Sequence, residues 1–592
     1  MGALSNQPTR RITRRSFVAG MAASGVVAAL GASGCTDQGA SAALRQIFYN
    51  GKVYTAQEGQ EATAFVVEDG KFLFVGSDDE ATQLAGAKGT LIDLEGRRVI
   101  PGLIDTHSHY LGLCSLDLLG LVQIDQTLSH DEVLALITET ARDNPLDDLP
   151  VIVGMGFGVD CIPLAAELDR ACDDRPVLLA DSGGHSGWSN TKMIEMAGLD
   201  ANTPDPKPGF SFYERDGAGN LTGRVVETDA LTHLLMVSGA ALPENIVLQL
   251  PYMIKALHSF GYTAVFDAGL LFVQESAAYA ALKNLDSTLQ VYCSFLFKGD
   301  PPVEEFFATM VRAREQFGSS WLHPTTLKMF KDGTLEAQSA WLSEEYLAPG
   351  SGFGGEVLTN ELMVEMAKRA GADGFNVHVH AIGDRAIDET LTVYEALGAI
   401  DGTKTMAHVQ VMPPGGIERF AAQPDVIIQT TPVWLRQDEY TWQVLGRERA
   451  LRQMPLRSAL AGGTLITFGS DAPVSGGLDG VNPFNNMHCA VNRSFDTETY
   501  FPPQSEGIDI SSCIDAYTIN GAKQLRAEHS FGSITEGKMA NFVILDQDIL
   551  KMPPKTIRDA NALQTWVQGQ CVYDATDPLT MLVEFIVTKL IL

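Results

Sequence analysis

Short apolar runs that each end in polar residues recur along the middle of the chain. Segments with helical periodicity lie between most of them, for example Asn360–Ala370 and Ala386–Ala399. Strand and helix alternating eight times predict the α/β class and a (β/α)8 TIM-like barrel. The predicted strands are Leu103–Thr106, Thr263–Asp267, Gln290–Phe295, Thr326–Phe330, Phe375–His380, Thr405–His408, Asp425–Gln429 and Thr464–Gly469.

The two chain ends carry a different pattern. Short alternating runs separated by glycine and aspartate lie between residues 46 and 94 and again between residues 532 and 567. This pattern is typical of a small β-sandwich, here formed from both ends of the chain. About 155 residues separate the first two barrel strands, far more than a βα connection needs, so we expect an inserted subdomain there.

These patterns divide the chain into five expected regions. They are an export signal (1–35), a β-sandwich (45–98 and 525–575), a barrel (99–120 and 241–524), an inserted subdomain (121–240) and an apolar C-terminal tail (576–592).

The N-terminus has the pattern of an export signal. Arg14 and Arg15 stand ahead of an uncharged apolar run, residues 19–32. Paired arginines before a short apolar segment indicate the twin-arginine route, which predicts a periplasmic or extracellular protein. Residues 32–35 resemble a lipoprotein cleavage box, so a lipid anchor on Cys35 is the membrane contact that the sequence suggests. The apolar run is too short to count as a secure membrane span.

Charge limits the class of partner. The formal net charge is -31, from 73 acidic and 42 basic residues. Nucleic-acid binding requires a basic surface, so the composition argues against it and leaves a small molecule as the expected partner. The sequence leaves the oligomeric state open.

A His-x-His pair closes the first predicted barrel strand. His107 and His109 follow the apolar residues 103–104. Residues i and i+2 of a strand point to the same face, so both imidazoles can converge on one ion at about 2 Å. Strand ends form the C-terminal mouth of a barrel, where active sites lie.

Polar residues stand at other predicted strand ends as well. His380 ends the fifth strand, His408 ends the sixth, and Asp471 follows the eighth. Lys328 lies among apolar residues of the fourth strand, where burying an ammonium is costly, so a neutral or modified state is expected. Together these side chains indicate a metal-dependent site at the barrel mouth.

The motifs that carry these residues resemble the amidohydrolase superfamily, and within it the YtcJ-like branch of formamide-deformylase type. The resemblance extends from residue 45 to residue 575. It rests on the segments 101–109 (PGLIDTHSH), 181–190 (DSGGHSGWSN), 327–333 (LKMFKDG), 380–386 (HAIGDRA), 407–410 (AHVQ), 469–473 (GSDAP) and 532–538 (GSITEGK).

The resemblance implies a pair of divalent metal ions. His107 and His109 would hold the more buried ion, and His380 and His408 would hold the second. Lys328 would be carboxylated by carbon dioxide, and its carbamate would bridge the two ions.

Asp471 would complete the first ion's ligands and act as the catalytic acid and base, moving a proton from water to the leaving group. Zinc suits this ligand set, although iron, manganese or cobalt also fits.

Two neighbouring residues compete with the ligands named above. Lys331 has the opposite strand parity to Lys328 and stands nearer the loop, so Lys328 is preferred. His378 shares the face of His380 but lies about 6.6 Å deeper, by two strand rises, and is interpreted as supporting or packing.

Four further side chains are candidates for lining a substrate pocket. His185 and Trp188 belong to the inserted subdomain, and Trp341 and Trp434 follow the fourth and seventh strands. Packing is the alternative for each of them. Residues 336–340 (EAQSA) depart from the family pattern in a loop that faces the mouth, so a relative's substrate cannot be transferred.

The function implied by the resemblance is metal-dependent hydrolysis of an amide, formamide or related C–N bond. Lactone or ester hydrolysis, or deamination, is the alternative within the superfamily. A metal-free binding or scaffolding barrel is the alternative outside enzymology. Relatives of that kind lose metal ligands, whereas this chain keeps all six.

Overall fold

The computed structural model describes residues 45–577, except for 58, 85–88, 117–119, 159–163, 182–183, 209–210, 271, 300, 348–351, 437, 474–477 and 496–502. The expected export signal (1–35), Cys35 and residues 578–592 of the tail lie outside the described residues. Among the described residues, no helix has both the length and the apolar character needed to cross a bilayer.

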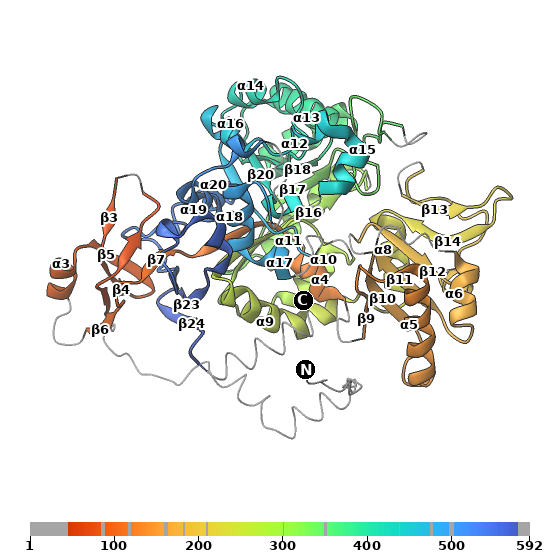
Figure 1. Ribbon diagram of the computed structural model, residues 1–592, viewed down its shortest axis with the longest axis horizontal. Coiled ribbons are helices and arrows are strands. Elements are labelled where there is room, and N and C mark those ends of the chain that lie inside the picture. The colour runs from red at the N-terminus through yellow and green to blue at the C-terminus, as the bar shows by residue number, and fades with distance from the viewer. Residues whose placement is uncertain are drawn as a thin grey trace, which may run out of the picture. The chain divides into compact units, whose positions relative to one another are not determined.

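Eight parallel strands form the central sheet (Figure 1), and β8 and β21 at its two edges contact each other. The Thr106 hydroxyl donates to the Phe468 carbonyl at 2.7 Å across this seam. The predicted α/β barrel is therefore confirmed. In sheet order the strands are β21 (Ile466–Phe468), β20 (Val426–Thr430), β19 (Lys404–His408), β18 (Asn376–Ala381), β17 (Leu322–Phe330), β16 (Gln290–Phe297), β15 (Tyr262–Asp267) and β8 (Leu103–Ser108).

Each predicted barrel strand overlaps one observed strand, and the boundaries differ by a few residues. The fourth strand begins at Leu322 rather than at Thr326, because the preceding residues still pair with β16. Side chains of β8 and β18 are buried along their whole length, as expected for parallel strands covered on both faces.

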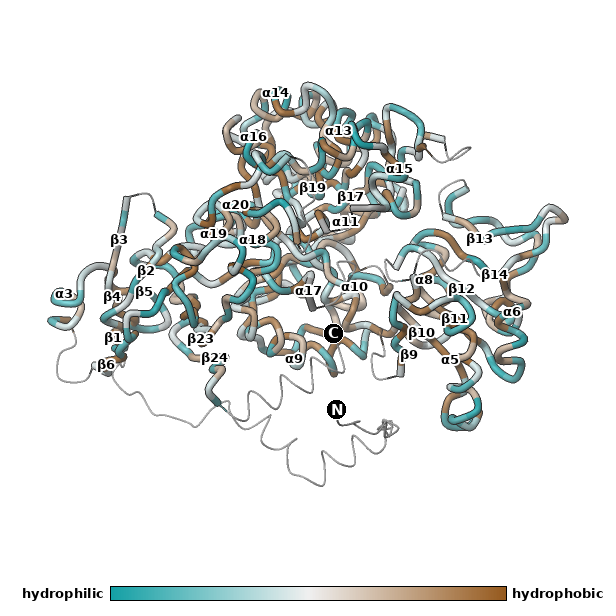
Figure 2. Tube along the Cα trace, viewed as in Figure 1, coloured by the Kyte–Doolittle hydropathy of each residue, from teal (hydrophilic) through white to brown (hydrophobic). Residues whose placement is uncertain are grey.

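Helices connect the barrel strands and cover the outside of the barrel (Figure 1). In α12, buried residues Met363, Met366, Ala367 and Ala370 recur at helical spacing, and the Thr359 side chain caps the first turn. Figure 2 shows hydrophilic and hydrophobic residues mixed along such outer helices. The helices are α9 (Pro243–Ser259), α10 (Glu275–Leu282), α11 (Val303–Phe317), α12 (Asn360–Ala372), α13 (Asp384–Leu397), α14 (Gly416–Ala421), α15 (Asp438–Ala450), α16 (Leu456–Ala461), α17 (Leu478–Val481), α18 (Pro483–Asn492), α19 (Ile510–Tyr517) and α20 (Ile519–Gln524).

The chain ends form two further sheets, one from N-terminal strands and the other from strands of both ends. Their shared core is aromatic. Phe48 packs edge-on against Phe542 with ring centroids 5.1 Å apart, and Phe542 stacks on Trp566 with ring centroids 5.6 Å apart. One sheet has the order β5 (Lys71–Gly76), β4 (Ala64–Glu68), β1 (Gln46–Tyr49), β6 (Thr90–Asp93). The other has the order β24 (Gln570–Asp574), β23 (Ala562–Val567), β22 (Phe542–Leu545), β7 (Arg98–Pro101), β2 (Lys52–Tyr54), β3 (Glu61–Ala62).

Between the first two barrel strands, the described residues form a six-stranded sheet and, besides α4 (Tyr110–Ser115) and α9, four helices. Its strands run in the order β13 (Phe212–Arg215), β14 (Leu221–Val226), β12 (Ser186–Ser189), β11 (Val177–Asp181), β10 (Ile152–Phe157), β9 (Val122–Gln123). Its helices are α5 (His130–Asp143), α6 (Ala165–Ala171), α7 (Thr191–Met196) and α8 (Thr228–Val237).

Polar contacts join this inserted sheet to the barrel. The Lys207 ammonium donates to the Val357 carbonyl, and Lys298 forms an ion pair with Asp229.

Candidate functional site

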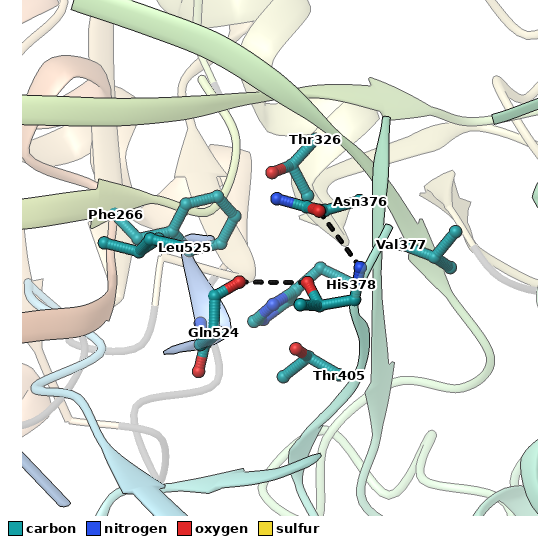
Figure 3. Close-up of a pocket in the computed structure, with 9 residues that line it drawn as sticks. Phe266, Thr326, Asn376, Val377, His378, Thr405, Gln524 and Leu525 are labelled. Atoms are coloured by element: carbon teal, nitrogen blue, oxygen red, sulfur yellow. Dashed lines mark hydrogen bonds between the residues drawn. The ribbon is translucent and has the colours of Figure 1, made fainter. Parts of the chain in front are cut away.

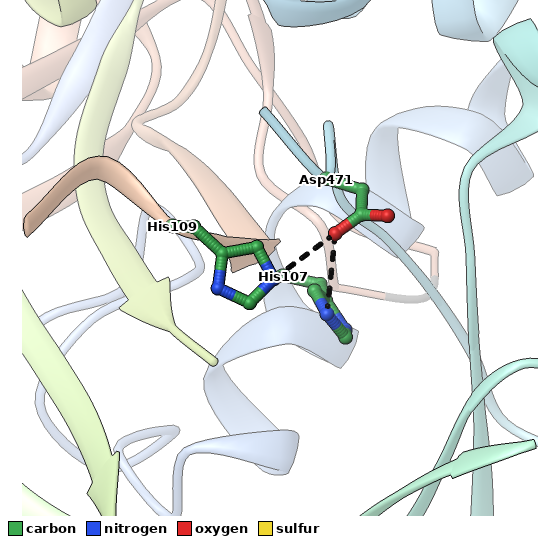
Figure 4. A group of neighbouring side chains, drawn as sticks. All are labelled: His107, His109 and Asp471. Atoms are coloured by element: carbon green, nitrogen blue, oxygen red, sulfur yellow. Dashed lines mark ion pairs between the residues drawn. The ribbon is translucent and has the colours of Figure 1, made fainter. Parts of the chain in front are cut away.

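Two histidines and an aspartate converge at the end of β8 (Figure 4). Asp471 Oδ1 lies 3.4 Å from His107 Nε2 and 3.3 Å from His109 Nε2. Possible ligand atoms of the three residues all lie within 4.8 Å of one another, and the three side chains are buried. This arrangement can hold one divalent metal ion.

The backbone explains why Asp471 reaches the histidines. Its N–H donates to the His107 carbonyl at 2.7 Å, and the His109 N–H donates to the Ala472 carbonyl at 2.9 Å. A Cβ atom at Gly469 would lie 2.5 Å from the His107 nitrogen, so only glycine lets the loop approach this closely. The loop after the eighth barrel strand therefore places Asp471 against the end of the first barrel strand.

The outer nitrogens of both histidines have partners that orient the rings. His109 Nδ1 donates to the Gly269 carbonyl at 2.8 Å, and His107 Nδ1 lies 3.0 Å from His378 Nε2. Such contacts leave the Nε2 lone pairs free for an ion. His378 thus contacts a predicted ligand from behind, as its depth on the strand suggests.

Lys328 lies fully buried on β17, with Nζ 3.5 Å from His107 Nε2. Burial lowers the pKa of Lys328 to about 7, although nearby Asp471 opposes the shift. Lys331 has other partners: its ammonium donates to Glu356 at 2.9 Å, to the Leu358 carbonyl at 3.0 Å and to Asn360 at 2.7 Å. The lysine beside the histidines is therefore Lys328.

His380 and His408 form a second histidine pair, with ring centroids 4.5 Å apart. The His408 ring lies 4.7 Å from that of His107, so the two groups of predicted ligands adjoin. His380 Nε2 donates to the Gly333 carbonyl at 3.0 Å, and Nδ1 has no hydrogen-bond partner among the described residues.

One nitrogen of this pair has no partner. His408 Nδ1 is buried and accepts or donates no hydrogen bond within the described part of the chain. A buried polar atom without a partner is uncommon and fits a site for an ion. Burial is also the largest cause that lowers the pKa values of His107, His380 and His408 well below their usual range, so these rings are neutral, the form that binds metal.

The four candidate substrate residues occupy different environments. Trp434 stacks on the His408 ring at 5.0 Å, and Trp341 packs under the Arg385 guanidinium at 4.4 Å. Trp188 is fully buried in the core of the inserted sheet and stacks on His130 at 5.3 Å, so packing explains it. His185 pairs with Glu227 at 2.6 Å.

Two carboxylates that sequence reasoning left without a role organise the loops of the mouth. Asp105 accepts from the Ser470 N–H at 3.0 Å and from the Tyr110 hydroxyl at 2.9 Å. Asp332 accepts from the backbone N–H groups of residues 341, 382 and 383 at 2.8–3.0 Å. Both lie inside motifs that carry the family resemblance, so the sequence contained a signal for their importance. Glu227 lies in no such motif.

A small pocket borders His378 lower in the barrel (Figure 3). Its lining includes Phe266, Asn376, Thr403 and Gln524. The Thr403 N–H donates to the Asn376 side chain at 3.0 Å, and the Thr403 hydroxyl donates to the Gln524 carbonyl at 2.9 Å. His378 is the one ionisable side chain in its described lining. The pocket therefore does not provide a second set of metal ligands.

The model of the Amidohydrolase family matches residues 90–573. The chain belongs to the amidohydrolase family. The match spans the barrel and both predicted groups of ligands. The predicted family resemblance is confirmed, and the chain is a hydrolase of the metal-dependent amidohydrolase superfamily.

Curated relatives cover most of the chain. Exoenzymes regulatory protein AepA of Pectobacterium carotovorum is 31% identical over 71% of this chain and 92% of its own length. Putative amidohydrolase YtcJ of Bacillus subtilis is 27% identical over 90% of this chain and 100% of its own length. The N-substituted formamide deformylase of Arthrobacter pascens is 25% identical over 87% of this chain and 95% of its own length.

A solved structure shares the fold. An uncharacterized metal-dependent hydrolase from Pyrococcus furiosus superposes with a TM-score of 0.65 at 25% identity, covering 86% of this chain and 100% of that chain.

Proposed function

We propose that this protein hydrolyses an amide, formamide or related C–N bond of a small molecule, with two divalent metal ions and a carboxylated lysine. The observation that carries the proposal is the position of Lys328. It is a fully buried lysine 3.5 Å from His107, in a group of neutral histidines. A carbamate there would replace a buried cation by an anion able to bridge two cations.

The donor set supports two ions. His107, His109 and Asp471 would hold the first, and His380 and His408 would hold the second. Nitrogen and oxygen donors of this kind suit zinc. The unpartnered nitrogen of His408 is the local reason to expect a ligand on the second group.

The reaction uses these residues in distinct roles. The metal pair, when bound, lowers the pKa of water and polarises the scissile carbonyl. Asp471, held against both histidines of β8, accepts the proton of the attacking water and returns it to the leaving nitrogen. Trp434, stacked on His408, would restrict access of water beside the second histidine pair.

A C–N bond is the preferred target because one relative at 25% identity is named for deformylation of N-substituted formamides. The loop 336–340 differs from the family pattern, so the groups around the scissile bond are left open.

Metal analysis followed by a substrate screen tests this proposal. Protein produced with ample zinc and bicarbonate should contain close to two ions per chain, measured by plasma mass spectrometry. It should then hydrolyse at least one of a set of N-formyl, N-acyl and cyclic amides. Folded protein without metal would contradict the enzyme function. Turnover of lactones, esters or amino-purines, but of no amide, would show that the enzyme acts on another kind of bond.

A further inference from the structure

A buried carboxylate joins the inserted sheet to the barrel mouth. Glu227 is 2% exposed and immediately precedes α8. Its Oε2 lies 2.6 Å from His185 Nδ1, and its Oε1 accepts from the Ser339 hydroxyl at 3.1 Å in the loop after β17. One side chain thus fixes the imidazole of His185 relative to the barrel.

The same loop reaches the predicted metal ligands. The Ser339 hydroxyl accepts from the Thr334 N–H at 3.0 Å, and the adjoining Gly333 carbonyl accepts from His380 Nε2 at 3.0 Å. His185 also lies close enough to His380 to lower its pKa electrostatically. The loop after β17 therefore links His185, through Glu227, to the second histidine pair.

Glu227 is held in place against a backbone cost. Its φ of 66° and ψ of 161° fall in a region that glycine alone populates readily. Its N–H donates to the His185 carbonyl. Conformations of this kind persist where the surrounding structure enforces them, and they cluster at functional sites.

The imidazole of His185 presents one donor that the protein does not use. Nδ1 is committed to Glu227, and no hydrogen bond from Nε2 is present among the described residues. The side chain is 19% exposed, so a small molecule can reach part of the ring. Burial favours the neutral ring, but the Glu227, Asp181 and Glu336 carboxylates together outweigh it and raise the pKa of His185 to about 9.

Three carboxylates surround this single imidazole. Besides Glu227, Asp181 on β11 accepts from the His185 N–H at 2.9 Å. The exposed Glu336 in the loop after β17 interacts electrostatically with His185, Asp181 and Asp471. His380 on β18 also interacts electrostatically with His185. Acidic side chains therefore outnumber the one imidazole here, which disfavours an anionic group on the part of a ligand that lies beside His185, away from the proposed metal ions.

We propose that His185, oriented by Glu227, is a substrate-binding residue that donates from Nε2 to an uncharged acceptor oxygen, and that the part of the substrate beside His185 is neutral or cationic rather than anionic. The inference rests on the proposed hydrolysis and specifies its substrate class. The acceptor can be the acyl oxygen or a neighbouring neutral carbonyl, because both offer the same lone pairs.

The first test needs no turnover. In NMR spectra of the intact protein with labelled histidine, the His185 signal is identified as the one missing from His185→Gln. This signal should show a ring that stays protonated to about pH 9. Glu227→Gln should lower that pKa, because the largest of the carboxylate effects that oppose burial is then lost. Glu195→Gln, an exposed carboxylate on α7 of the same sheet, should leave it unchanged. N-methylformamide should shift the signal more strongly than acetate.

The second test uses two matched substrates, N-formylphenylalanine and N-formylphenylalanine amide. The neutral amide should have the higher kcat/KM by tenfold or more, and Glu336→Gln should narrow the difference. His185→Gln should reduce kcat/KM for the amide by about ten- to hundredfold, the loss of one charged hydrogen bond. In wild-type protein KM should rise above about pH 9, and Glu227→Gln should move that rise to lower pH.

Clear outcomes overturn the inference. One is a His185 signal that titrates in the ordinary range and does not shift with N-methylformamide. The others are a higher kcat/KM for the anionic acid than for the neutral amide, and unchanged kinetics in His185→Gln. If the wild-type protein hydrolyses no C–N bond, the proposed function fails. The NMR titration and the two small probes still support or refute the binding role.

Discussion

At the scale of single residues, burial changes the chemistry of ordinary side chains. Lys328 is fully buried, and this burial lowers its pKa to about 7. An amine that loses its proton near neutral pH can react with carbon dioxide, whereas an ammonium cannot. Lys331, three residues later, donates to three oxygen atoms, one of them in an ion pair with Glu356.

Lys328→Ala should therefore abolish activity and remove at least one metal ion, because the bridging anion is lost and the two cations repel each other. Formate or acetate should restore part of both, since a small carboxylate fits the vacated space. Metal content and turnover, each measured with and without the acid, check this expectation.

Lys331→Ala is the matched control. It should lower the melting temperature, because the buried Leu358 carbonyl loses this donor, but keep the metal content. Full activity in both variants would remove the carbamate from the mechanism. Loss of metal in Lys331→Ala alone would show that the bridging lysine was misassigned.

At the scale of elements, each barrel strand presents its last residues at the mouth, and the helices behind hold the strands in register. Between α9 and β15 this support is a buried histidine. His258 Nδ1 donates to the Tyr262 carbonyl at 2.9 Å, and Nε2 lies 2.8 Å from the Thr288 hydroxyl. Burial lowers the pKa of His258 to about 4.

This shift predicts a contribution to the pH dependence of folding. The folded pKa lies below the unfolded value of about 6.5, so the unfolded chain binds the proton first. The stabilisation is complete above pH 6.5 and is lost as the pH falls toward 4. In urea unfolding of metal-free protein, His258→Gln should reduce the slope of stability between pH 6.5 and 4.5, by at most about 1.4 kcal/mol per pH unit. An unchanged slope would show that the ring is already protonated in the fold.

At the scale of the whole molecule, three regions combine: the sheets built from both chain ends, the barrel, and the inserted sheet. The inserted sheet is joined to the barrel through Lys207, Lys298 and Glu227. We propose that the protein is assembled with its metal in the cytoplasm and exported in the folded state by the twin-arginine route, with Cys35 as a lipid-anchor site.

Arg14→Lys combined with Arg15→Lys should leave the precursor in the cytoplasm, because that route requires the arginine pair. Arg10→Lys combined with Arg11→Lys, which alters the neighbouring pair, should be exported normally. Cell fractionation followed by immunoblotting measures both, and normal export of the first double variant would contradict the route.

The sequence by itself determined the barrel and its eight strands, because apolar runs with polar ends are local patterns that each strand carries. It also placed His107, His380, His408 and Asp471 at strand ends. Their role as metal ligands stays a prediction that metal analysis tests.

Tertiary structure alone decided which distant side chains meet. Glu227 lies 42 residues from His185 and 112 residues from Ser339, and no local pattern links the three. The same holds for Trp188, whose ring packs within the inserted sheet. Backbone periodicity reports which face a residue occupies, whereas hydrogen-bond partners depend on how separate elements pack, which a single sequence does not encode locally.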